Sequence, residues 1–255
     1  MAQDNTVQSV KRAIMILEEL ATEKEGLGVT ELANRVDLHK STVHRMLNTL
    51  LNMGYIEQSS SSERYRLGIK LLSLGGAILE RMDIRHEAHD LLKELSEKVK
   101  ETVHLVVPDG YRAIYIDKLD SNKTIRMYSQ IGRIAPLHAS AVGKAILAFS
   151  EERFIKEVIE QGLFKCSKKT ITEPKLLLEH LKMIREQGFS VDDEENEEGI
   201  RCVGAPVFDY TGKVVGAISV SGPTVTVTPE KIDQIAENVI ECAKNISRRM
   251  GWEAQ

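Results

Sequence analysis

Residues 29–51 read VTELANRVDLHKSTVHRMLNTLL, and this stretch decides the fold of the first part of the chain. A helix of about two turns is predicted over residues 31–36, with Thr30 in the position of an N-cap. A break at residues 37–39 follows, and residues 40–51 predict a second helix that Gly54 ends as a C′ glycine. Two short helices joined by such a turn are typical of a helix-turn-helix.

The second helix carries side chains that suit the major groove of DNA. Hydroxyl groups near a helix N-terminus favour phosphate contacts, and arginine can bind guanine through two hydrogen bonds. The residues predicted to contact DNA are Lys40, Ser41, Thr42, His44 and Arg45 on this helix, with Arg64 further along the chain.

The neighbouring segments extend this pattern into a winged helix-turn-helix. Apolar residues at helical spacing predict an amphipathic helix before it, ended by Gly26 and Gly28. Residues 55–57 and 64–67 predict two short strands around four serines at 59–62, and this hairpin would form the wing. A small packed module without DNA is the alternative, but the order of the segments favours DNA binding.

The composition restricts the possible classes of protein but does not indicate a function. The chain has 255 residues, with 42% apolar and 28% charged residues, which predicts a soluble globular protein of one large or two ordinary domains. A net charge of -4 does not indicate nucleic acid, so the evidence for DNA is local. The sequence has no apolar run of membrane-spanning length and no evident signal peptide, and its three cysteines are far apart. We therefore expect a cytoplasmic location, with free thiols and no membrane contact.

The remainder of the chain predicts a sensor-like α/β domain with a mainly antiparallel sheet. Asp109-Gly110 is a strong hairpin signal between two strands. Strands are predicted at residues 102–108, 113–119, 125–128, 189–192, 201–209 and 213–221, and helices at 84–100, after 140, at 151–160, 174–188 and 229–250.

Several strings along the chain resemble the IclR family of bacterial transcriptional regulators. They are V-x-x-A-x-x-I-L, V-T-E-L-A, K-S-T-V-H-R and Y-R-L-G-I-K-L-L-S-L-G in the first part, and P-L-H-A-S-A-V-G-K-A and A-I-S-V-S-G-P in the second. The resemblance implies an α+β protein with a winged helix-turn-helix over residues 1–67, a linker helix over 68–83 and a GAF-like effector-binding domain over 84–255. It also implies a homodimer or homotetramer on double-stranded operator DNA, with no cofactor.

Other strings resemble one group within the family, the regulators of pectin and hexuronate breakdown that respond to 2-keto-3-deoxygluconate. They are K-E-T-V-H-L, I-R-M-Y-S-Q-I-G-R, R-E-Q-G and N-E-E-G-I-R-C. This resemblance implies a repressor of a sugar-acid operon that a small carboxylate effector releases from its operator. A ligand-dependent activator of the same fold is the alternative.

The resemblance also assigns an effector site. By the residues alone, Ser140 would only cap a helix, and Ser219 and Ser221 could face either solvent or a pocket, because they share one side of a strand. The acidic run at 193–198 would be a solvated loop without the spacing of a Ca²⁺ or Mg²⁺ site. The residues that the resemblance places around the effector are Ala141 and Val142, through their backbone amides, with Asp192, Ile200, Cys202, Ser219 and Ser221.

An enzyme is the competing class of function. Cys202, His138 and Asp192 could be imagined as a hydrolase triad, and His86, His89 and His104 as metal ligands. Neither set has a recognised spacing, and the sequence contains no nucleophile elbow, P-loop or dinucleotide fingerprint. We therefore expect no enzymatic activity and no bound metal.

Overall fold

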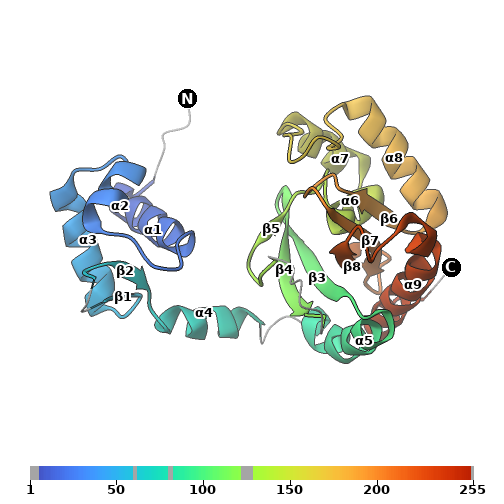
Figure 1. Cartoon of the computed structure of the whole chain (residues 1–255), viewed down its shortest axis with the longest axis horizontal. Coiled ribbons are helices and arrows are strands. Elements are labelled where there is room, and N and C mark those ends of the chain that lie inside the picture. Colours follow the sequence, from blue (N-terminus) through green and yellow to red (C-terminus); the bar gives the residue numbers. More distant parts are fainter. Residues whose placement is uncertain (1–5, 60–61, 80–82, 122–128, 254–255) are drawn as a thin grey trace. The chain divides into compact units, whose positions relative to one another are not determined.

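The computed structural model describes residues 6–59, 62–79, 83–121 and 129–253. The chain divides into two compact units, Met1–Arg81 and Met82–Gln255 (Figure 1), and each has a hydrophobic core of its own. The strand predicted at 125–128 and positions 60–61 of the predicted wing tip lie outside the described residues.

The first unit contains three helices, a two-stranded hairpin and a further helix. Val43, Leu47 and Leu50 are buried against the other helices. The elements are α1 (Gln8–Ala21), α2 (Val29–Arg35), α3 (Lys40–Asn52), β1 (Ile56–Gln58), β2 (Tyr65–Leu67) and α4 (Lys70–Leu79), which lies within the predicted linker. Strand β1 pairs antiparallel with β2, as expected for a wing.

Two helix boundaries differ from the prediction. Helix α1 ends at Ala21, before Gly26, because the hydroxyl of Thr22 turns back to bind the carbonyl of Glu19. Helix α2 begins at Val29 with Gly28 as its N-cap, so Thr30 lies in the first turn and does not cap it. The carboxylate of Glu31 accepts the N–H of Gly28 at 2.8 Å, and this bond replaces a side-chain cap.

Within its described residues, the second unit is built on one six-stranded antiparallel sheet in the order β5-β4-β3-β8-β7-β6. Gly110, with a φ of 55°, makes the predicted turn between β3 and β4. The strands are β3 (Thr102–Asp109), β4 (Arg112–Leu119), β5 (Ile134–Ala135), β6 (Ser190–Asp193), β7 (Ile200–Phe208) and β8 (Val214–Pro223). The predicted antiparallel sheet is confirmed, while the short edge strand β5 was not predicted.

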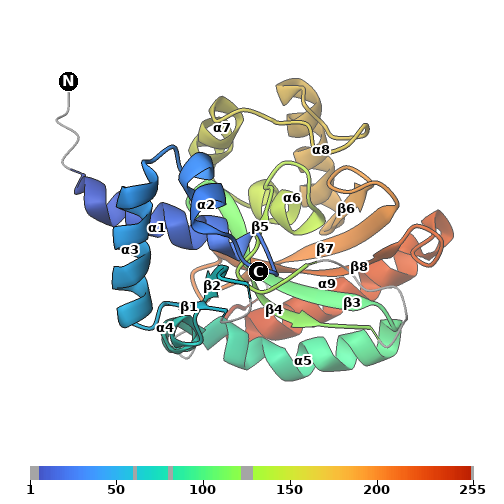
Figure 2. The same cartoon turned by 60° about the vertical axis from the view of Figure 1, so that its left-hand side comes forward.

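Helices cover both faces of this sheet (Figures 1 and 2). Helices α5 (Asp83–Val99) and α9 (Ile232–Arg249) pack on one face, and α6 (Ala141–Ala148) packs on the other, with α8 (Pro174–Gln187) behind it. Helix α7 (Glu152–Glu160) joins the second layer, and a 3₁₀ turn at Pro229–Lys231 precedes α9.

Helix α6 approaches the sheet closely because Gly204 leaves room for its backbone, and Gly143 leaves room for the loop that follows β5. A Cβ at Gly204 would lie 3.0 Å from the carbonyl carbon of Ala141, and one at Gly143 would lie 2.4 Å from the carbonyl oxygen of Pro136. The hydroxyl of Ser190 also donates to the carbonyl of Ala141 at 2.6 Å. The first turn of α6 is therefore held directly against β6 and β7.

Candidate DNA interface and effector cavity

Helix α3 presents one polar face, as the pattern of its sequence predicts. Its buried positions alternate at helical spacing with positions that remain open to solvent. Of the predicted DNA-binding residues on α3, Lys40, Ser41, His44 and Arg45 are exposed and Thr42 is half-buried. The side chains needed for groove contacts are thus displayed together, and their contacts with DNA stay a prediction.

Arg64 also has partners within the protein. Its Nε donates to the carbonyl of Gly26 at 3.0 Å, and its Nη2 lies 3.0 Å from Oε2 of Glu31. The same carboxylate oxygen caps Gly28, so Arg64 connects the wing to the start of α2. The predicted phosphate contact of Arg64 remains a prediction, but its side chain has a structural role that sequence reasoning missed.

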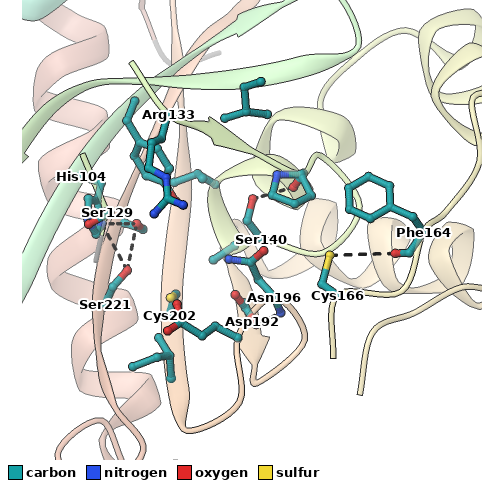
Figure 3. Close-up of a pocket in the computed structure, with 18 residues that line it drawn as sticks. His104, Ser129, Arg133, Ser140, Phe164, Cys166, Asp192, Asn196, Cys202 and Ser221 are labelled. Carbon is teal, nitrogen blue, oxygen red and sulfur yellow. Dashed lines mark hydrogen bonds between the residues drawn. The ribbon is translucent and has the colours of Figure 1, made fainter. Parts of the chain in front are cut away.

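The second unit contains a cavity of about 540 Å³ between the sheet and the N-terminus of α6 (Figure 3). The two serines on β8 are buried, with exposed fractions of 3% and 2%, which argues against the solvent-facing alternative. All the residues assigned to the effector line this cavity: Ala141, Val142, Asp192, Ile200, Cys202, Ser219 and Ser221.

The register of the sheet brings several of these side chains into one row. Asp192 on β6 opposes Cys202 on β7, and Cys202 opposes Ser221 on β8. Ser219, two residues away, opposes His104 on β3 and shares this face. Residues distant in sequence thus form one continuous polar surface beneath α6.

The start of α6 supplies backbone donors to the same cavity. Ser140 is its N-cap, and the hydroxyl of Ser140 accepts the N–H of Gly143 at 3.1 Å. Lys144 makes the first intrahelical bond, to the carbonyl of Ser140 at 2.9 Å. The N–H groups of Ala141 and Val142 precede that bond, in the part of a helix that favours anions.

His104 belongs to this cavity, although the sequence suggested only a metal ligand. Its Nε2 lies 2.6 Å from the hydroxyl of Ser129, and its Nδ1 lies within 3.5 Å of the hydroxyls of Ser219 and Ser221. Burial lowers the pKa of His104 to about 3, so its ring is neutral. A neutral imidazole can orient the two serine hydroxyls without adding charge.

Most of the other lining residues were missed because they come from loops, whereas His104, Tyr115 and Ile134 lie on strands. A β-strand pattern marks which residues share a face, but no local pattern shows that a loop folds over a distant strand. The lining residues outside the prediction are His104, Tyr115, Ser129, Arg133, Ile134, Pro136, Ser140, Phe164, Cys166, Asn196 and Glu197. Register with Ser219 was the one signal that could have found His104.

The acidic run after β6 is not a purely solvated loop, which corrects the prediction. Glu195 is only 5% exposed, and its carboxylate forms an ion pair with the fully buried Lys144 of α6. Lys144 also donates to the carbonyl of Val191 at 2.7 Å. A buried cation therefore ties the loop to the helix, and this pairing could not be recognised before the two segments were brought together.

Asp192 accepts hydrogen bonds from the loop that this ion pair holds. Its Oδ1 accepts the N–H groups of Glu195 at 2.7 Å and of Asn196 at 3.2 Å. Burial nevertheless raises the pKa of Asp192 to about 7, although Lys144 acts in the opposite direction. Near neutral pH the group can either accept or donate a hydrogen bond.

The imagined hydrolase triad is not assembled. The Nε2 of His138 lies 2.8 Å from the carbonyl oxygen of Phe164, and His138 lines a neighbouring cavity that neither Cys202 nor Asp192 lines. Burial also raises the pKa of the Cys202 thiol well above its ordinary value, which disfavours a thiolate nucleophile. Within the described ranges, no group of three His, Cys, Asp or Glu residues could hold a metal ion.

A winged helix-turn-helix joined to a domain with a polar, partly enclosed cavity defines a DNA-binding regulator controlled by a small molecule. Models of two families match the chain: "IclR helix-turn-helix domain" over residues 9–60 and "Bacterial transcriptional regulator IclR C-terminal" over residues 76–248. The chain belongs to the IclR family of bacterial transcriptional regulators, which are not enzymes.

Individual relatives agree along nearly the whole chain. The HTH-type transcriptional regulator KdgR of Escherichia coli K12 is 41% identical over 251 residues, which are 98% of this chain and 95% of that protein. The transcriptional repressor IclR of the same organism is 34% identical over 96% of this chain and 90% of that protein. The crystal structure of the Thermotoga maritima IclR is 36% identical, with a TM-score of 0.80, and covers 97% of this chain and 100% of that chain.

Among the described residues, no helix is long and apolar enough to cross a membrane.

Proposed function

We propose that this regulator is a repressor of an operon for the breakdown of a sugar acid, and that a carboxylate such as 2-keto-3-deoxygluconate releases it from its operator. The observation that carries the proposal is the cavity of about 540 Å³, which combines the N-terminus of α6 with a row of hydroxyl and carboxyl groups. A polyhydroxy acid has the complementary chemistry, because it presents an anion at one end and several hydroxyls along its length.

The proposed ligand would lie with its carboxylate at α6. The amides of Ala141 and Val142 would donate to it, and the hydroxyls of Ser219 and Ser221 would bind the same end. Asp192 would contact hydroxyls at the other end, while the small side chain of Cys202 and the apolar Ile200 would close the wall. Charge-assisted bonds of this kind contribute about 1.5–3 kcal/mol each.

Release from DNA requires a ligand that binds one conformation better than another. The effector would favour the conformation with low operator affinity, so that binding shifts the population away from DNA. A homodimer or homotetramer would read two half-sites. The similarity to KdgR and to a protein named as a repressor supports repression, together with the sequence strings shared with hexuronate regulators.

The test replaces the serines of the cavity. In the double variant Ser219→Ala and Ser221→Ala, we expect effector affinity to fall at least ~10-fold in calorimetry, while operator affinity in a gel shift stays nearly unchanged. Ser150→Ala is the matched control, because Ser150 follows the C-terminal end of α6 and lies outside the cavity lining.

The outcomes separate the parts of the proposal. A double variant that releases DNA at the wild-type effector concentration would place the effector site elsewhere. A wild type that binds pyruvate, glyoxylate or an aromatic acid instead of 2-keto-3-deoxygluconate would refute the sugar-acid effector alone. A footprint upstream of the promoter, with transcription rising on ligand addition, would show an activator.

A further inference from the structure

Arg133 directly precedes the edge strand β5, and its side chain lines the effector cavity. Its carbonyl accepts the N–H of Tyr115 at 3.0 Å, and the neighbouring N–H of Gly132 donates to the carbonyl of Tyr115 at 2.8 Å. Gly132 and Arg133 together oppose Tyr115, so the antiparallel pairing of β4 and β5, in which Ile114 opposes Ile134, extends to Arg133 through a β-bulge. Residues that oppose each other across such a pair point to the same face, so Arg133 shares the cavity face of Tyr115.

The picture of the site agrees with this register. Figure 3 shows the side chain of Arg133 extending into the cavity, toward the space bordered by Ser140 on one side and Ser221 on the other. The backbone is held by a turn in which the N–H of Arg133 donates to the carbonyl of Gln130 at 3.1 Å. The guanidinium therefore projects from a fixed segment into the space that a ligand would occupy.

The charges of the residues around the cavity indicate what Arg133 could bind. Among the lining residues that the structure describes, Arg133 is the one cation, while Asp192 and Glu197 contribute carboxyl groups and His104 is neutral. The nearby Lys144 of α6 is buried in its ion pair with Glu195 and does not line the cavity. A carboxylate ligand would add negative charge beside two carboxyl groups.

Helix α6 alone offsets only part of that charge. The N-terminus of a helix acts as roughly half a positive charge, which is less than the full charge of a carboxylate. A guanidinium supplies a full charge and a planar pair of donors that matches the two oxygens of a carboxylate. The cavity thus has two recognition elements for an acid, on separate segments of the chain.

We propose that Arg133 is a specificity residue that distinguishes a sugar acid from a neutral sugar, by binding the carboxylate of the effector together with the amides of α6. This inference rests on the proposed function and adds to it the residue that selects for an anion. An effector whose carboxylate is masked would lose the contact with Arg133 but would keep its hydroxyl contacts with the far wall.

The test measures preference for the acid over its ester. Full-length wild type, Arg133→Gln and Arg133→Lys are titrated in a calorimeter with 2-keto-3-deoxygluconate, with its methyl ester and with pyruvate. We expect Arg133→Gln to weaken binding of the acid roughly 10- to 100-fold with little change for the ester, because a charge-assisted contact is lost. Arg133→Lys should recover part of the preference. Arg112→Gln, an arginine that lines the neighbouring cavity, should behave as wild type.

The outcomes test the role of Arg133 separately from the identity of the effector. Equal losses for acid and ester in Arg133→Gln, or no loss, would overturn the role of Arg133. A wild type that binds none of these acids, pyruvate included, would overturn both the proposed function and this inference. If the wild type binds pyruvate alone, the sugar-acid effector is refuted. A roughly 10-fold loss of pyruvate affinity in Arg133→Gln would then still support the carboxylate contact, and an unchanged affinity would refute it.

Discussion

The ion pair of Lys144 and Glu195 should be among the most sensitive points of the effector domain. The Lys144 side chain is fully buried, and its Nζ binds both the Glu195 carboxylate and the carbonyl of Val191. The second oxygen of Glu195 is buried with no hydrogen-bond partner within the described part of the chain. Removing Lys144 would therefore leave an uncompensated carboxylate in a low-dielectric interior.

We expect Lys144→Met to lower the free energy of unfolding by about 3–5 kcal/mol, the usual cost of breaking a buried pair from one side. Glu195→Gln should cost a similar amount, because it leaves the lysine charge buried. The double variant should cost much less than the sum of the two, since no unpaired charge remains. For a domain of this size, the single losses correspond to a fall of roughly 6–20 °C in melting temperature.

The assay can report the effector domain alone. The chain has a single tryptophan, Trp252, which stacks on Phe208 with ring centroids 5.3 Å apart. Urea unfolding followed by its fluorescence, at one fixed protein concentration, gives the stability of this domain for each variant. Lys182→Met is the control, because its pair with Glu186 is exposed and should contribute little. Additive losses in the double variant, or a loss below about 1 kcal/mol for Lys144→Met, would refute the reasoning.

Three further variants test other parts of the molecule. Arg45→Ala should cost about 1–3 kcal/mol on the cognate operator and relax base preference at one position, and an unchanged binding profile would remove Arg45 from the interface. The raised pKa of Asp192 stabilises the folded domain below about pH 4, and this contribution is lost as pH rises through about 7. The stability of the wild type relative to that of Asp192→Asn should therefore fall by roughly 2–4 kcal/mol at most over that range, and equal pH profiles would contradict the assignment. Gly204→Ala should place a Cβ 3.0 Å from the carbonyl carbon of Ala141, displace the start of α6 and weaken effector binding about 10-fold. Gly75→Ala, whose Cβ would meet no atom of the described residues within 4 Å, should leave effector binding unchanged.

Local pattern was sufficient for most elements of this protein, although it did not predict the two-residue strand β5. The spacing of Val43, Leu47 and Leu50 indicated α3, because a helix buries one stripe of its surface. Asp109 and Gly110 indicated the hairpin of β3 and β4, because few residues adopt the conformations of such a turn. The N-cap of α2 was placed wrongly, since Glu31 caps Gly28 from within the helix and no preceding side chain does so.

The sequence by itself determined the helix-turn-helix, the antiparallel strands and, through resemblance, a set of residues on α6, β6, β7 and β8 that line one cavity. Only the tertiary structure decided how loops complete the cavity. Arg133 is paired with Tyr115, and Glu195 is buried with Lys144 of α6. Periodicity records which face of an element is buried. Periodicity does not show which distant segment provides the charged partner of a residue on that face. That pairing is set only when the segments pack together.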